Sequence, residues 1–351
     1  MSAMRSICLL GSLVVGTLGS STAAAEPPAS IVHARIEVAH DVSPAAALAS
    51  VTKDGEASWV GWSVPAVGST GEICCFNSKF HSRSCSLSGN DWSWGTIDSK
   101  GSPSEAAEIF VLIQKERGRV TGVRIVSPTC EVNGADRKLL WLGAVAPTDS
   151  LAALGKLVDE GSRDHVGEPA LAAIAYHATP AADAVLEHRA LDRTLDEDSR
   201  KQALFWAGNL RGERGYRLLD RVLGEEADPD LREHAVFALT QSSAAPAIDR
   251  IKRAATEDRA ASVRGQALFW LAQSHAPGAG EWIVGRLDAE RDGEVREQAV
   301  FALSQLSDGT DWLIQLLRSK RDPEIVRKAL FWLGQSEDPR ALEELEKILD
   351  R

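Results

Sequence analysis

The short catalytic and cofactor-binding motifs by which many enzymes are recognised are missing from this sequence of 351 residues. It contains no His-Glu-x-x-His, no Gly-x-Ser-x-Gly, no phosphate-binding glycine loop and no Cys-x-x-Cys, so none of those sites is indicated. Ser50-Val-Thr-Lys53 matches Ser-x-x-Lys, but the Ser-Asp-Asn and Lys-Thr-Gly partners of that acyl-transfer site do not occur. A match this short arises by chance. We therefore expect no enzyme activity and no cofactor.

A surplus of basic charge is also missing. The formal net charge is −11 and the isoelectric point is near 5.3. Binding to a nucleic-acid backbone or to an anionic membrane surface needs a dominant basic patch. The charge balance argues against both kinds of partner.

Long apolar runs are absent except at the N-terminus. Arg5 precedes an apolar run from Ile7 to Leu18, which is followed by three alanines and Glu26. A charged start, a short apolar core and small residues are typical of a cleavable secretory signal, and a membrane anchor needs about 20 apolar residues. We expect residues 1–25 to be a signal peptide and the mature protein to be periplasmic or secreted. No membrane span is predicted after cleavage.

Cysteines are few, and all of those that remain after cleavage precede the C-terminal half: Cys74, Cys75, Cys85 and Cys130. An even number of cysteines in an exported chain indicates disulfides. Adjacent cysteines bridge each other only with strain, so Cys74 and Cys75 should pair separately with the other two, in either order. Cys74, Cys75, His81 and Cys85 offer an alternative tetrahedral zinc site. We favour disulfides and expect no metal.

The first half of the mature chain is predicted to be rich in β-structure. Alternating or β-branched apolar residues favour strands at 34–38, 58–65, 108–114 and 120–126, and the last two should form a hairpin about a charged turn with glycine. Pro147 to Val158 reads as a helix. We place a β-rich domain at residues 26–160.

The second half is built from copies of one short unit. Gln266-Ala-Leu-Phe-Trp-Leu-Ala-Gln273 recurs with small changes, and its marker phenylalanines are spaced by 32, 32, 32 and 30 residues: Phe205, Phe237, Phe269, Phe301 and Phe331. A fixed period of this length indicates a stacked repeat array. Each copy reads as a helix pair, and a faded copy with Ala173 at the marker position precedes them. The fold class expected is α+β, with an all-α solenoid at residues 161–351 after the small disulfide-containing β-rich domain.

The repeats resemble HEAT repeats of the short bacterial type also found in bilin lyases. The resemblance rests on Asp228-Pro-Asp-Leu-Arg232, Asp292-Gly-Glu-Val-Arg296 and Glu337-Asp-Pro-Arg-Ala-Leu342. It implies a ladder in which aspartates and arginines join successive repeats: Asp196, Arg200, Asp228, Arg232, Arg264, Asp292, Arg296 and Asp322. Ala260 and Val326 depart from the family pattern, so the ladder is expected to be interrupted there.

The N-terminal half is similar to the front domain of uncharacterised exported bacterial HEAT proteins. This looser resemblance rests on Trp59-Val-Gly-Trp62-Ser-Val-Pro65, on Cys74-Cys75 and on the region from Cys130 to Trp141. It implies no activity.

One side of the marker helix carries a repeated set of aromatic and amide side chains. Residues three and four apart are neighbours on a helix, so each phenylalanine lies beside the amide four residues later: Asn209, Gln241, Gln273, Gln305 and Gln335. The position after each phenylalanine alternates between tryptophan and alanine and is assigned to the core. Amides beside aromatic rings suit an extended peptide. The competing interpretation is that the phenylalanines only pack between helices.

Taken together, these features predict an exported, non-enzymatic binding or scaffolding protein whose array binds a protein or extended peptide on its inner helix face. The alternative is an accessory or catalytic protein in which the disulfide-bonded front domain acts and the repeats only orient it. The oligomeric state is not indicated by the sequence.

Overall fold

The structure of the chain is a computed structural model, which describes residues 26–51, 58–67, 72–75, 84–88, 94–97, 108–160, 166–319 and 322–349. The predicted signal peptide, His81 and Lys53 lie outside the described residues. Within them, no helix is long and apolar enough to cross a membrane.

The N-terminal region is built on a five-stranded sheet with the order β2-β10-β3-β7-β8. The strands are β1 (Ile31–Val32), β2 (Arg35–Val38), β3 (Ser58–Pro65), β4 (Glu72–Cys75), β5 (Ser84–Ser86), β6 (Trp94–Ile97), β7 (Glu108–Glu116), β8 (Arg119–Val126), β9 (Glu131–Asn133) and β10 (Lys138–Ala144). Strand β10 is parallel to β2 and β3, whereas β7 is antiparallel to β3 and β8. The predicted hairpin of β7 and β8 is confirmed. Two small sheets, β1-β9-β5 and β4-β6, lie outside this sheet.

Both faces of the five-stranded sheet are buried. On β3, Val60, Trp62 and Val64 belong to the core that also contains the apolar residues of the neighbouring helices. Trp59, on the opposite face, packs with Trp141 and with the four cysteines. Side chains alternate between faces along a strand, so a strand with no exposed face reads as an almost continuous apolar run. Gly61 leaves room for the Trp141 ring, since a Cβ there would lie 3.0 Å from it.

The rest of the chain is helical. The helices are α1 (Pro44–Ser50), α2 (Pro147–Glu160), α3 (Glu168–Tyr176), α4 (Pro180–Leu191), α5 (Glu197–Leu210), α6 (Gly212–Glu225), α7 (Pro229–Thr240), α8 (Ala247–Glu257), α9 (Ala261–Gln273), α10 (Ala279–Leu287), α11 (Gly293–Ser304), α12 (Gly309–Arg318), α13 (Pro323–Gly334) and α14 (Pro339–Leu349). The chain is thus an α+β protein, a β-rich region with two disulfides followed by a solenoid of helix pairs.

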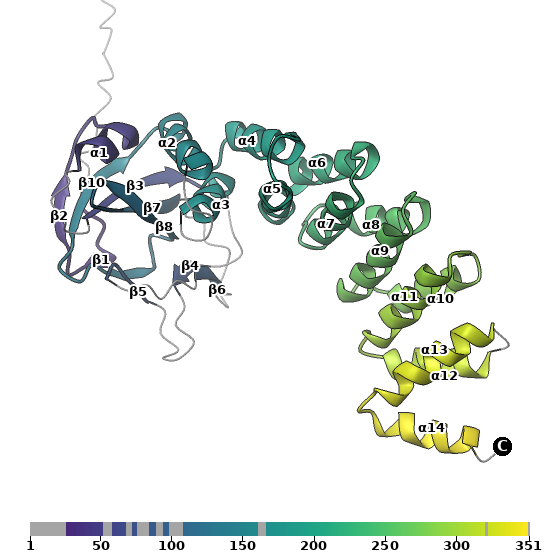
Figure 1. Ribbon diagram of the computed structural model, residues 1–351. Helices are drawn as coiled ribbons and strands as arrows, with labels where there is room; N and C mark the ends of the chain where they lie inside the picture. Colours follow the sequence, from purple (N-terminus) through teal and green to yellow (C-terminus); the bar gives the residue numbers. More distant parts are fainter. Residues whose placement is uncertain are drawn as a thin grey trace, which may run out of the picture.

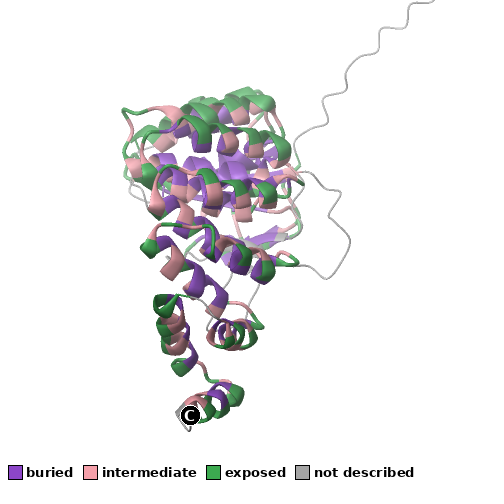
Figure 2. Ribbon diagram, turned by 90° about the vertical axis from the view of Figure 1, so that its right-hand side faces the viewer, coloured by how far each residue is buried: buried purple, intermediate pink, exposed green. Residues whose placement is uncertain are grey.

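The helix pairs stack into a curved array with two rows (Figure 1). Helices α3, α5, α7, α9, α11 and α13 contact one another in sequence and form the inner row, on the concave side. Helices α4, α6, α8, α10, α12 and α14 form the outer row. In Figure 2, buried segments follow the surfaces where helices meet, and the outward surfaces of the helices are exposed. The marker phenylalanines all belong to the inner row.

The sheet and the array share one core. Helix α2 packs on β3, and α3 packs on both β8 and α5. Ala173, the marker residue of the faded repeat, is fully buried in this shared core. The predicted division at residue 160 coincides with the end of α2, but α3, on the far side of it, still contacts the sheet.

Candidate functional site

The inner helices from α5 to α13 each carry a marker phenylalanine that is less buried than the core residues of its own repeat. In α9, Val263, Ala267 and Leu271 are fully buried, whereas Phe269 is half-buried. At roughly 100° per residue, Phe269 lies opposite the centre of that buried arc. Aspartate side chains begin four of the inner helices by accepting backbone N–H groups at the N-cap: Asp196, Asp228, Asp292 and Asp322. Helix α9 starts at Ala260 without such a cap.

The phenylalanines form part of a continuous row of aromatic rings along the inner face. Phe205 stacks on Phe237 at 6.0 Å and Phe269 stacks on Phe301 at 5.7 Å between ring centroids. Trp270 and Trp332 fill the gaps, each 4.7 Å from the phenylalanine of the preceding repeat. These separations lie in or near the range of favourable aromatic pairs. From ring to neighbouring ring, the row is Tyr176, Trp206, Phe205, Phe237, Trp270, Phe269, Phe301, Trp332 and Phe331, and its first two members are buried.

Both interpretations of the phenylalanines describe part of this arrangement. Phe205, Phe237, Phe269 and Phe301 are half-buried because each packs against a neighbouring ring, so they do contribute to helix packing. Each nevertheless keeps part of its surface open to the concave side. Phe331, at the end of the row, is 55% exposed. The face therefore combines a packing role with accessible apolar surface.

The tryptophans are less buried than the core assignment predicts. Trp206 is buried, but Trp270 and Trp332 are only half-buried. The alanines that alternate with them, Ala238 and Ala302, are fully buried. Each alanine leaves space beside its own phenylalanine, and the next repeat's tryptophan reaches that phenylalanine from the other side. The tryptophans thus belong to the aromatic row as well as to the core.

The amides four residues after the phenylalanines form a parallel row. Asn209, Gln241, Gln305 and Gln335 are exposed, and Gln273 is half-buried. Gln241, Gln305 and Gln335 are the C-cap residues of their helices. The side-chain N–H groups of Gln241 and Gln305 donate only to the adjacent Thr240 and Ser304 hydroxyls, at 2.9 and 3.1 Å. These local bonds leave the amides accessible to a partner.

His234 replaces glutamine on the N-terminal side of Phe237. Its ring lies 5.4 Å from the Phe237 ring in an edge-on arrangement. Burial, with a smaller contribution from the Lys201 charge, lowers the pKa of His234 to about 4. His234 is therefore neutral at physiological pH, and it adds polarity but no charge to the face.

The arginines of the predicted ladder join successive repeats, but three of their four acceptors differ from the predicted aspartates. Arg200, Arg232, Arg264 and Arg296 each donate to a carboxylate 26 residues later: Glu226, Asp258, Glu290 and Asp322. Asp228 and Asp292 cap helices instead, as does Asp196. Asp322 performs both tasks, because the last repeat is two residues shorter. The interruption expected at Ala260 does not occur, since Asp258 supplies the carboxylate.

The ladder carboxylates stay ionised because several donors converge on them. Burial alone raises the pKa of Glu226, but hydrogen bonds from Arg200 and from the backbone N–H groups of Asp228 and Ala227 outweigh it and lower the pKa. Asp258 and Glu290 follow the same pattern with Arg232 and Arg264. Each carboxylate therefore links the preceding repeat's arginine to the start of its own repeat's inner helix.

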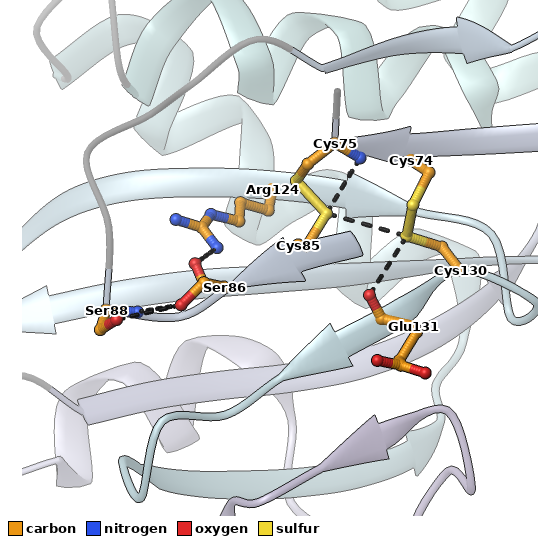
Figure 3. Close-up of a disulfide and its surroundings, with 8 residues drawn as sticks. All are labelled: Cys74, Cys75, Cys85, Ser86, Ser88, Arg124, Cys130 and Glu131. Carbon is orange, nitrogen blue, oxygen red and sulfur yellow. Dashed lines mark hydrogen bonds between the residues drawn. A yellow bond between two sulfur atoms is a disulfide. The ribbon is translucent and has the colours of Figure 1, made fainter. Parts of the chain in front are cut away.

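The four cysteines form two adjacent disulfides, Cys74–Cys130 and Cys75–Cys85 (Figure 3). Cys85 Sγ lies 3.8 Å from Cys130 Sγ, so the two bridges pack against each other. Arg124 lies beside them, donates to the carbonyl of Ser86 and stacks over the Trp59 ring at 5.0 Å. Burial lowers the pKa of Arg124 to about 10. Sulfur atoms of Cys74, Cys85 and Cys130 lie within 4.8 Å of one another, but a metal binds thiolates, which bridged cysteines do not offer.

A buried polar network that we did not predict joins the sheet to the array. Trp62 on β3 donates its indole N–H to the Ser150 hydroxyl of α2 at 2.8 Å, and that hydroxyl lies 2.8 Å from His177 Nε2. His177 Nδ1 is 2.7 Å from the Ala173 carbonyl, so Nδ1 carries the proton and Nε2 accepts from Ser150. Burial lowers the pKa of His177 to about 4. Arg211 extends the network by donating to the His177 carbonyl and to Asp183.

This network resembles a serine–histidine pair only in composition. Ser150 and His177 are both completely buried, and the hydroxyl already accepts from an indole. No substrate reaches them without unpacking the sheet. The Ala66–His177 bridge and the bond from Ala178 N–H to the Pro65 carbonyl reinforce the same junction. The network fixes the array relative to the sheet.

The chain is similar to HEAT-repeat proteins in its C-terminal part. Residues 280–351 match the family model for HEAT repeats. Human deoxyhypusine hydroxylase in complex with glycerol is 16% identical over 54% of this chain and 77% of its own length, with a TM-score of 0.27. Kap121p and a Kap121p mutant are 14% and 12% identical over 53% of this chain and 23% of theirs, with TM-scores of 0.28. No curated protein matches the chain.

Proposed function

We propose that this protein is an exported, non-enzymatic binding or scaffolding protein that holds a protein or extended peptide against the inner face of its repeat array. The observation that carries the proposal is the continuous aromatic row from Phe205 to Phe331, flanked by accessible amides. Solenoids use their extended concave surfaces for binding, and the HEAT-repeat match of residues 280–351 supports that use here.

Export is supported by the two disulfides. Structural disulfides persist in oxidising compartments such as the periplasm and are rare in the cytosol. The bridges Cys74–Cys130 and Cys75–Cys85 hold three segments of the front region together. We propose a periplasmic or secreted location on this ground, together with the signal-like N-terminus.

The test uses the full mature chain, because the sheet and the first repeats share one core and a cut at residue 160 would expose it. Immobilised protein is incubated with periplasmic extract, and bound proteins are compared between variants. Gln241→Ala with Gln305→Ala removes two exposed amides of the inner face. Gln315→Ala, on the outer helix α12, is the matched control because Gln315 is also exposed.

A second pair of variants tests the apolar part of the face. Phe331 is 55% exposed on the inner row and Leu342 is 62% exposed on α14 of the outer row. Phe331→Ala should release a bound partner while Leu342→Ala retains it, since truncating an aromatic anchor weakens binding more than truncating a peripheral apolar residue. Unchanged capture by every inner-face variant would refute the proposal and favour action by the front domain.

A further inference from the structure

The inner face carries a third row of side chains that specifies a class of partner. The position seven residues before each marker phenylalanine lies on the same side of the helix, two turns nearer its start. It is acidic in four of the five repeats, at Asp198, Asp230, Glu294 and Glu324, and all four side chains are exposed. The face thus has acids on one side of the aromatic row and amides on the other.

The basic side chains that the structure describes on this face pair with carboxylates. Lys201 pairs with Glu197 and Lys328 pairs with Glu297 at 2.6 Å, while Arg327 pairs with Glu324 of the acidic row itself at 2.8 Å. Neutral His234 adds no positive charge. With Glu324 compensated by Arg327, the acidic row contributes negative charge mainly at α5, α7 and α11, so charge complementarity favours a basic partner along the aromatic row.

The spacing of the repeats selects the backbone conformation of the partner. Packed helices lie about 8–10 Å apart, so a chain that crosses the inner row meets a new set of rings at that interval. A polyproline II chain completes one turn every three residues and rises about 3.1 Å per residue, which brings the same side of the chain back about every 9 Å. A β-strand returns to the same side after about 7 Å and loses register with the array.

The flanking amides favour the same conformation. A polyproline II chain makes no internal hydrogen bonds, so its carbonyl groups are free to accept from the N–H groups of Gln241, Gln273 and Gln305. Prolines lack N–H groups and leave no donor unpaired on the bound chain. An α-helix, in contrast, has already used its backbone groups internally. Aromatic surfaces also bind proline-rich segments in other recognition modules.

We infer that the inner face binds a basic, proline-rich segment in the polyproline II conformation, with an apolar residue at every third position over the aromatic row and lysine or arginine toward the acidic row. The inference rests on the proposed function and names the partner's chemistry.

The test measures fluorescence anisotropy of labelled 15-residue probes with the full mature chain. A probe of five Pro-Pro-Lys units spans roughly 46 Å as polyproline II, enough to cross the five inner helices from α5 to α13. Five Gly-Ser-Lys units carry the same charge without the conformation, and five Pro-Pro-Glu units carry the conformation with opposite charge. We expect the Pro-Pro-Lys probe to bind at least ~10-fold more tightly than either control.

Variants locate the binding. Asp230→Asn with Glu294→Gln should weaken Pro-Pro-Lys binding and reduce its dependence on salt. The matched control, Asp249→Asn with Glu281→Gln, removes two exposed carboxylates from outer helices and should leave binding unchanged. Phe331→Ala should also weaken binding, and thermal melting should show that each variant remains folded.

The inference would be overturned if the Pro-Pro-Lys probe did not bind, or if the Gly-Ser-Lys or Pro-Pro-Glu probe bound equally tightly. It would also be overturned if none of the inner-face variants changed the affinity for the Pro-Pro-Lys probe. If the probe fails while inner-face variants still lose partners in the capture experiment, the proposed function stands and only the partner chemistry is wrong. If capture is also indifferent to those variants, the proposed function fails.

Discussion

The salt bridges between repeats should contribute unequally to the stability of the array, because they differ in burial. Two bridges at equivalent positions, one buried and one exposed, allow their contributions to be compared. Arg232 donates through Nε and one terminal N–H group to the two oxygens of Asp258, each at 2.9 Å, and donates to two backbone carbonyls as well. Only 1% of the Arg232 side chain and 5% of the Asp258 side chain are exposed. The equivalent pair, Arg296 with Asp322, has 21% and 44% of its side chains exposed and is joined by a single bond of 3.0 Å.

The perturbation is the substitution of asparagine for each aspartate. Asparagine keeps the oxygen that accepts from the N–H of Ala260 or Glu324, so the start of the inner helix is preserved. Asp258→Asn removes the carboxylate that Arg232 hydrogen-bonds and leaves Asp228 and Glu226 as weaker counter-charges for the buried guanidinium, which should lower the free energy of unfolding by about 3 kcal/mol. Asp322→Asn should cost about 0–1 kcal/mol, because water and salt screen that pair.

The assay is urea denaturation followed by far-UV circular dichroism, with both single variants, Arg232→Met and Arg296→Met, and the two double variants. Replacing both partners of the buried pair should recover much of the loss seen with Asp258→Asn, since no unpaired charge remains. The double-mutant cycle for the exposed pair should give a coupling energy below about 1 kcal/mol. Equal losses for Asp258→Asn and Asp322→Asn would refute the argument from burial.

Three further perturbations have defined outcomes. Phe269→Ala should lower the free energy of unfolding by about 1–3 kcal/mol, a value between those for buried and exposed side chains, because Phe269 is half-buried. Urea denaturation measures this loss. The control is Leu268→Ala, which truncates a buried side chain and should lower the free energy of unfolding more. His177 has a pKa near 4 in the folded protein and near 6.5 in the unfolded chain, so between these pH values protons bind preferentially to the unfolded chain. The free energy of unfolding should therefore fall by about 3 kcal/mol from this residue as the pH drops from about 6.5 to about 4. A weaker pH dependence in His177→Gln would confirm that His177 is the source. Thiol titration of the denatured mature protein should find no free thiol, whereas Cys130→Ser should yield one, from Cys74; two thiols reacting in the unsubstituted protein would contradict the bridges.

The repeats were predictable because their information is local and repeated. The marker phenylalanines, the N-cap aspartates and the 3.6-residue apolar spacing specify each helix within its own segment. The hairpin of β7 and β8 was predictable for the same reason, since its two strands are adjacent in the chain. Copying of the unit then placed the aromatic and amide side chains on one face.

Contacts between distant segments were not predictable in the same way. The choice of Cys130 for Cys74 depends on how β4, β5 and β9 lie against one another, and β5 pairs with β9 across more than 40 residues of chain. The network of Trp62, Ser150 and His177 likewise brings together three segments with no shared sequence pattern.

The ladder acceptors did leave a signal in the sequence. Glu226, Asp258, Glu290 and Asp322 recur every 32 residues, although the marker phenylalanines shift to a spacing of 30 at the end. The family resemblance directed attention to the N-cap aspartates instead. Because glutamate and aspartate alternate at the acceptor position, the period is visible only when acidic residues are counted as one class.

Site-specific photo-cross-linking tests the central claim most directly. A benzoylphenylalanine placed at Phe269 of the full-length protein, in the cells that express it, keeps an aromatic ring in the row. The same group at Arg253, exposed on the outer helix α8, and at Lys138, exposed on β10, provides the controls. Our account predicts a cross-linked protein partner from position 269 and none from position 253 or 138. Cross-linked products from position 138 alone would contradict it and assign partner binding to the front domain.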